Sequence, residues 1–165
     1  MILTVPTEPQ RVGSPIMINI SVKNISSQPL WMIGVLDGSE MGFRYPHYKP
    51  SITGSVPIPP PENLPWCGNV APLRLQDFHY LLPGESFDPI VPQEGAEYLP
   101  LVIFNSFRPS LPGHYEFRLE VSTESEQEED WLGVLEYPGK ENVLARLAKV
   151  PRLQIESNVL SVEVI

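Results

Sequence analysis

The sequence predicts an all-β fold in which short antiparallel strands pack as a sandwich. Proline occupies 20 of the 165 positions, and each proline lacks a backbone N–H and clashes with the preceding helical turn, which excludes long helices. Two segments, residues 16–24 and 113–121, alternate apolar and polar side chains with the period of two that places one set on a single strand face. The expected inward-facing residues are Ile16, Ile18, Ile20 and Val22 in the first segment, and Tyr115, Phe117, Leu119 and Val121 in the second.

Further apolar segments with turn signals between them complete the predicted sandwich. We expect strands over 30–36, 73–82, 98–104 and 158–165, and one helix of about two turns over 142–149. The run at 30–36 is nearly all apolar, which is typical of a central strand covered on both faces. In 73–82, the side chains of Phe78, Tyr80 and Leu82 are expected to share one face. Because this many short strands favour a sandwich and no repeat or linker divides the chain, residues 1–165 are predicted to form a single domain.

Residues 45–65 differ from the rest of the chain because seven of them are proline. Proline cannot donate to a hydrogen-bond ladder, so this segment is excluded from the centre of a sheet. We predict a long extended loop, partly in the polyproline II conformation, that lies over the sandwich. Within it, residues 57–60 fit a P-x-x-P pattern, which either docks on an aromatic groove of a partner or, as the simpler interpretation, forms a stiff connector.

Three segments carry a resemblance to known proteins. They are residues 18–24 followed by Pro29 and Leu30, residues 82–87 with Pro83-Gly84, and residues 112–117 with Pro112-Gly113. These segments resemble bacterial immunoglobulin-like domains, and their order is similar to that in the Bacillus intracellular proteinase inhibitor family. The resemblance implies an immunoglobulin-like antiparallel β-sandwich, and it makes proteinase inhibition one of the functions to consider.

Charge and composition argue against several classes of partner. The formal net charge is −9 and the eleven lysines and arginines are scattered, so we expect neither nucleic acid nor an anionic membrane surface as a partner. No stretch reaches the ~20 apolar residues needed to cross a bilayer, so no membrane insertion is expected. No export signal is visible, which predicts a cytoplasmic location if Met1 is the native start.

No catalytic or metal-binding motif is recognisable, so we predict a protein that is not an enzyme and that needs no metal or cofactor. The histidines His47, His79 and His114 lack the spacing of a zinc site. The acidic run at 124–130 contains no glycine to bend it around calcium, and we interpret it as the solvated tip of a hairpin. The single cysteine, Cys67, forms no intrachain disulfide and has no neighbouring group that would activate it as a nucleophile.

The best candidate site is the aromatic, locally basic part of the Pro-rich segment. Its residues are Phe43, Arg44, Tyr45, His47 and Tyr48, together with Trp66. Tyr, Trp and Arg dominate the energetic centres of protein interfaces, and their flat amphipathic rings also suit sugar faces. The alternative is structural, because the same rings can fold back and cap an open end of the sandwich.

We therefore expect a non-catalytic module that binds another protein through this aromatic loop. A proteinase inhibitor is one alternative, with residues 43–66 or 107–109 as the inserted loop. A carbohydrate-binding module is another, and it requires the rings of Tyr45, Tyr48 and Trp66 to be exposed and coplanar. An enzyme would need a deep pocket holding His47 or His79 beside a carboxylate. The oligomeric state stays open.

Overall fold

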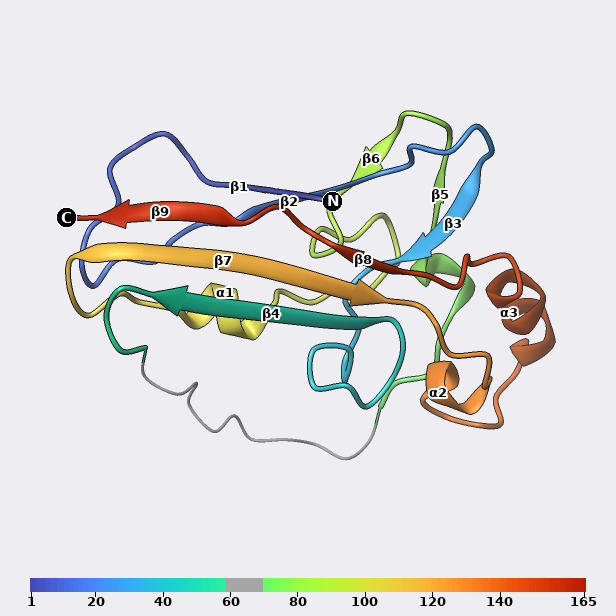
Figure 1. Ribbon diagram of the computed structural model, residues 1–165. Coiled ribbons are helices and arrows are strands. Elements are labelled where there is room, and N and C mark those ends of the chain that lie inside the picture. Colours follow the sequence, from blue (N-terminus) through green and yellow to red (C-terminus); the bar gives the residue numbers. More distant parts are fainter. Residues whose placement is uncertain (59–69) are drawn as a thin grey trace.

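A computed structural model describes residues 1–58 and 70–165 of the chain (Figure 1). Within these residues the strands are β1 (Ile2–Thr4), β2 (Asn19–Lys23), β3 (Leu30–Ile33), β4 (His47–Gly54), β5 (Phe78–Leu81), β6 (Ser86–Phe87), β7 (Gly113–Ser122), β8 (Gln154–Glu156) and β9 (Leu160–Val164). The helical elements are the 3-10 turn η1 (Leu75–Asp77) and the helices α1 (Val102–Ser106), α2 (Glu129–Leu132) and α3 (Lys140–Leu147). Antiparallel strands dominate and helices are few and short, which confirms the all-β class.

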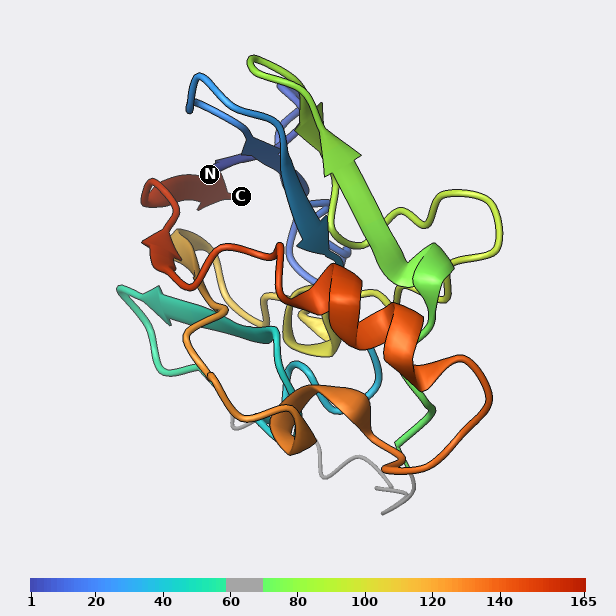
Figure 2. The ribbon, with the colours of Figure 1, turned by 90° about the vertical axis from the view of Figure 1, so that its right-hand side faces the viewer.

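The described strands form three antiparallel sheets. One has the order β1-β2-β6, and a second is the two-stranded ribbon β3-β5. The third is built on β7, which pairs with β4 along one edge and with β9 and then β8 along the other. Figure 1 shows β4, β7 and β9 side by side, and Figure 2 shows the β3-β5 ribbon with α3 beside it. Side chains from all three sheets meet in one buried apolar cluster.

The two alternating segments bury the faces that the sequence predicts. Each of the eight expected inward-facing residues is buried, although β2 itself spans only Asn19–Lys23 of the first segment. In the core, Phe107 packs edge-to-face against Tyr115 at 5.4 Å and against Phe117 at 5.7 Å between ring centroids. Burying a side chain of this size contributes about 1.5–3 kcal/mol, so the face of β7 is a large part of what holds the sheets together. At the C-terminus, β9 confirms the strand predicted over 158–165.

The β3-β5 ribbon corrects the predictions for residues 30–36 and 73–82. The segment expected to be a central strand is one half of a two-stranded ribbon, since β3 pairs only with β5 within the described residues. Phe78 is buried, whereas Tyr80 is 46 % exposed and Leu82 is exposed too. One face of the ribbon, which carries Met32 and Leu81, is buried in the core. On the opposite face the pair Ile33–Phe78 is buried, whereas the pair Trp31–Tyr80 keeps accessible surface.

The strand predicted over 98–104 is not formed. Extended chain leads into α1, whose first two N–H groups, those of Val102 and Ile103, donate to the carboxylate of Glu40 at 2.6 and 2.9 Å. Such N–H groups have no partner within a helix and need an outside acceptor. Burial raises the pKa of Glu40, and these two hydrogen bonds oppose that rise. Because Glu40 lies 62 residues before Val102 in the sequence, the local pattern contains no signal that a helix starts there.

The prediction of a loop over 45–65 is wrong for residues 47–54. These residues form β4 and pair with β7 along their whole length. Proline is tolerated because β4 is an edge strand. The N–H of Tyr48 donates to the carbonyl of Ser39 at 3.1 Å, away from β7. By the period of two, the position of Pro50 also faces this outer edge, so the N–H that proline lacks removes no bond from the β4–β7 ladder. The triple-proline part of the predicted loop lies outside the described residues.

Two further predictions concern the C-terminal third of the chain. The predicted helix is confirmed as α3, which begins two residues earlier than expected and buries Val143 and Leu147; α1 and α2 are additional. The acidic run at 124–130 is not a hairpin tip, because the chain leaves β7 and continues into α2. The fully buried Trp131 of α2 donates its indole N–H to the carbonyl of Ser125 at 3.0 Å, which anchors the acidic segment to the core.

Candidate functional site

The structure divides the predicted site residues into buried and accessible ones. Arg44 and Tyr48 are 2 % and 0 % exposed, Tyr45 and His47 are half-buried, and Phe43 is 49 % exposed. Trp66, like Cys67, lies outside the described residues. For Arg44 and Tyr48, therefore, the arrangement is the structural alternative in which the side chains pack back onto the sandwich.

Arg44 joins three separate parts of the chain. Its guanidinium donates to the Asp37 carboxylate at 3.0 Å, to the carbonyl of Ala71 at 2.6 Å and to the carbonyl of Trp131 at 2.7 Å. The second oxygen of Asp37 accepts the N–H of Ala71 at 2.6 Å. Burial lowers the pKa of Arg44, and the charge of Asp37 opposes that fall. This network ties the turn at 37–46 to the chain at Ala71 and to α2, and it leaves the guanidinium inaccessible to a partner.

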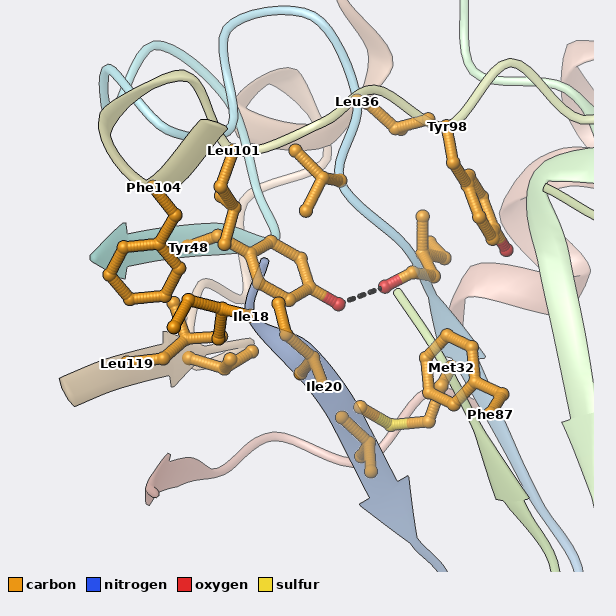
Figure 3. Close-up of a cluster of buried hydrophobic side chains, with 14 of the residues drawn as sticks. Ile18, Ile20, Met32, Leu36, Tyr48, Phe87, Tyr98, Leu101, Phe104 and Leu119 are labelled. Atoms are coloured by element: carbon orange, nitrogen blue, oxygen red, sulfur yellow. Dashed lines mark hydrogen bonds between the residues drawn. The ribbon is translucent and has the colours of Figure 1, made fainter. Parts of the chain in front are cut away.

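Tyr48 is a core residue of β4. Figure 3 shows its ring among Ile18, Leu101, Phe104 and Leu119. Its hydroxyl donates to the carbonyl of Ile33 at 2.6 Å, which connects β4 with β3. Burial raises the pKa of Tyr48 well above its ordinary value, so the hydroxyl stays protonated and keeps donating.

Tyr45 and His47 stack on each other, and Tyr45 also contacts Trp131 of α2. Their ring centroids are 3.8 Å apart, and the Tyr45 ring lies 5.4 Å from that of Trp131. Burial lowers the pKa of His47, and the neighbouring Lys49 lowers it further. The carbohydrate platform expected from Tyr45, Tyr48 and Trp66 lacks an exposed Tyr48, so that arrangement of three rings is not present.

An apolar groove lies beside the turn at 37–46, and we name it the turn groove. Its volume is about 290 Å³, and it is lined by Val35, Leu36, Asp37, Gly38, Glu40, Met41, Leu99, Pro100 and Val102. Met41 is 63 % exposed and Leu99 is 42 % exposed at this groove. Sequence reasoning missed both residues, because neither stands out locally and they come together only in the fold. The exposed Phe43 belongs to the same turn, so the groove borders the predicted site.

A partly exposed cluster, which we name the Trp31 cluster, consists of Trp31, Tyr80 and Arg146. The rings of Trp31 on β3 and Tyr80 on β5 are 4.7 Å apart with planes tilted by 48°. The guanidinium carbon of Arg146, on α3, lies 4.3 Å from the centre of the Trp31 ring. These residues come from three distant segments, so the sequence contains no local signal for the cluster.

The polar cavity next to Arg44 is lined by charged side chains that form ion pairs with one another. It has a volume of about 140 Å³, and its lining includes Arg44, Arg74, Asp77 and Glu97. Arg74 donates to Asp77 at 3.0 Å and to Glu97 at 3.1 Å. The hydrogen bond to Asp77 raises the pKa of Arg74. Neither His47 nor His79 lines this cavity, so the cavity does not place either histidine beside a carboxylate.

The loop at 107–109 presents one exposed residue between two buried ones. Phe107 and Pro109 are buried and Arg108 is exposed. The Arg108 guanidinium donates to the carbonyls of Asn105 and Phe107, both at 2.8 Å. The Gly13 N–H donates to the Pro109 carbonyl at 2.8 Å, so the loop is held at both ends.

The three histidines lie in different environments. His79 stacks on Phe87 with centroids 4.8 Å apart, burial lowers its pKa, and its Nδ1 is buried without a hydrogen-bond partner among the described residues. His114 is exposed on β7. In the described ranges, no three His, Cys, Asp or Glu side chains gather as metal ligands would. None of the helices seen in these ranges has the length and apolar character to span a bilayer.

Comparison with known proteins adds no relative: the chain matches no family model, no curated protein and no solved structure.

Proposed function

We propose that this protein is an immunoglobulin-like β-sandwich that serves as a non-catalytic protein-binding module. The fold assignment is supported by the antiparallel sheets, which contribute side chains to one shared core. It is also supported by the positions of the resembling segments, which fall on β2, on the turn before β6 and on the start of β7.

The turn groove is the observation that carries the binding function. Exposed apolar surface that is grouped rather than scattered is typical of interaction sites, and methionine is enriched in them. Met41 and Leu99 line the groove and are accessible. The buried side chains of Arg44 and Tyr48 anchor the turn at 37–46 to the core. A turn anchored in this way loses little conformational entropy on binding, so that more of each contact survives as affinity.

A charge placed in the groove tests this proposal. We expect a Met41→Asp/Leu99→Asp variant to recover less partner than wild type in a pull-down from the source cell, by about tenfold or more. The matched control is Ile2→Asp/Val159→Asp, which changes two residues of similar exposure, 55 % and 43 %, outside the groove lining. Both variants should keep their melting temperatures. Equal recovery by the two variants would exclude the turn groove as the contact surface.

Proteinase inhibition is the second candidate, and the tethered loop at 107–109 favours it. An inhibitor must present a rigid exposed residue to an active-site cleft, and Arg108 stands between two buried neighbours. The test is titration of a trypsin-like proteinase with wild type and with Arg108→Ala. Inhibition by wild type that is lost in the variant would support this function. No inhibition at stoichiometric concentrations of wild type would dismiss Arg108 as an inhibitory residue for this class of proteinase.

A further inference from the structure

The Trp31 cluster combines the three residue types that dominate protein interfaces in one partly exposed group. Tyr80 lies against Trp31, and Arg146 lies over the Trp31 ring, so that the three side chains form a continuous surface. Tyr80 is 46 % exposed, and Trp31 and Arg146 are partly exposed. The supports of this surface are regular elements, since β3 and β5 pair over four residues and α3 packs against η1.

Arg152 also lies over an aromatic ring, that of Trp131, but it pairs with Glu126 at 3.7 Å. Arg146 differs from it in having no acceptor among the described residues. Within the described ranges its guanidinium forms no ion pair, and its side chain donates no hydrogen bond. Its contact with the Trp31 ring leaves the N–H groups at its edge available. A guanidinium held in this way matches the planar geometry of a carboxylate, to which it can donate two parallel hydrogen bonds.

We propose that the Trp31 cluster is a second binding surface, distinct from the turn groove, for an acidic segment of a partner protein. A carboxylate of that segment pairs with Arg146, and an adjacent apolar or aromatic side chain of the segment packs on the exposed ring of Tyr80. Charge complementarity selects this partner. Arg146 forms no ion pair with the described residues of this chain of net charge −9, so its charge is available to attract an acidic segment during encounter.

Two other ligands fit this surface less well. Nucleic acid needs several cations that neutralise successive phosphates, and the cluster supplies a single arginine in an acidic molecule. A sugar ring needs an open aromatic face, and here Arg146 covers the Trp31 ring while the two aromatic planes are tilted by 48°.

Two random copolymers serve as defined probes, one of glutamate and tyrosine and one of lysine and tyrosine. The indole N–H resonance of Trp31 in the full-length protein reports binding at the cluster. We expect the Glu–Tyr copolymer to shift this resonance and the Lys–Tyr copolymer to leave it in place. Arg146→Glu should weaken binding of the Glu–Tyr copolymer by about tenfold or more. Arg146→Gln is a second variant that removes the charge without introducing a new one.

The control is Arg118→Glu, which makes the same charge change at an exposed position of β7 for which no ion pair is seen in the described ranges. Binding by Arg118→Glu within about twofold of wild type, with loss in both Arg146 variants, would support the proposal. Equal loss in Arg118→Glu and Arg146→Glu would overturn it, because net charge alone would then explain binding. It would also be overturned if Arg146→Glu bound the Glu–Tyr copolymer as wild type does, or if a neutral cello-oligosaccharide or single-stranded DNA shifted Trp31 while the Glu–Tyr copolymer did not.

Discussion

Two regions of this molecule carry the same residue types and use them in opposite ways. At the turn of residues 37–46 and in β4, Arg44 and Tyr48 are buried, and they donate hydrogen bonds to Asp37 and to main-chain carbonyls of the protein itself. On the β3-β5 ribbon and α3, Tyr80 and Arg146 keep accessible surface, and Arg146 donates to no described residue. Residue type alone therefore does not separate a structural arginine or tyrosine from one available for binding. The difference lies in whether main-chain carbonyls and carboxylates of the fold satisfy its donors.

The largest effect that separates the two regions is expected from removing the two tyrosine side chains. Tyr48→Ala should lower the free energy of unfolding by roughly 3–5 kcal/mol, because it opens a cavity in the core and removes the bond to Ile33. Tyr80→Ala, by contrast, should cost less than about 1 kcal/mol, since its ring is partly exposed. Urea denaturation of both variants measures the difference. Similar losses in the two variants would contradict the contrast between core and surface.

The two arginines provide the next contrast. Arg44→Met should destabilise the fold by about 3 kcal/mol, because it leaves Asp37 and two carbonyls without their donor, and the partial exposure of Asp37 keeps the cost near the low end for a broken buried pair. Arg146→Met should cost no more than about 1 kcal/mol, the value of an exposed cation–aromatic contact. The measurement is again the unfolding free energy. An Arg44→Met variant as stable as Arg146→Met would show that the Arg44 network does not hold the turn at 37–46.

A smaller change isolates the hydroxyl groups. Tyr48→Phe keeps the ring and removes the hydrogen bond to the carbonyl of Ile33, and we expect a loss of about 1 kcal/mol. Tyr80→Phe is the control at the exposed position and should change stability by less than about 0.5 kcal/mol. A melting temperature of Tyr48→Phe equal to that of wild type would mean that the link between β4 and β3 contributes nothing.

The smallest expected effect is a pH dependence at His79 of β5, which stacks on Phe87. Burial lowers the pKa of His79 below its ordinary value of 6.5 in the folded protein, although Glu85 opposes this. Between the folded pKa and the ordinary one, the unfolded chain binds more protons, so stability is fully present above the ordinary pKa and falls as the pH drops through that window. The free energy of unfolding of wild type should therefore rise relative to that of His79→Asn from about pH 5 to about pH 8. Melting temperatures at several pH values measure it, and a difference that shrinks as the pH rises would contradict the assigned cause.

The candidate site shows how far sequence reasoning reaches. It singled out Phe43, Arg44 and Tyr45, which stand close together in the chain and lie in the turn of residues 37–46. It did not find Met41 and Leu99, because the turn groove joins segments about 60 residues apart. Nor did it find the Trp31 cluster, whose three members lie on β3, β5 and α3. Proximity in the chain was the available signal, and proximity in space is what makes a site.

The sequence by itself determined the all-β class, the faces of β2 and β7, the C-terminal strand and the position of α3, because each depends on a periodicity of neighbouring residues. The tertiary structure decided the rest through partners that lie far along the chain. Tyr48 is a core residue because β4 pairs with β7, and because its N–H and its hydroxyl donate to the carbonyls of Ser39 and Ile33. A helix, α1, forms in place of a predicted strand because Glu40 accepts hydrogen bonds from its first N–H groups. A backbone donor or an aromatic ring takes its role from whichever group satisfies it, and the identity of that group is set by the fold.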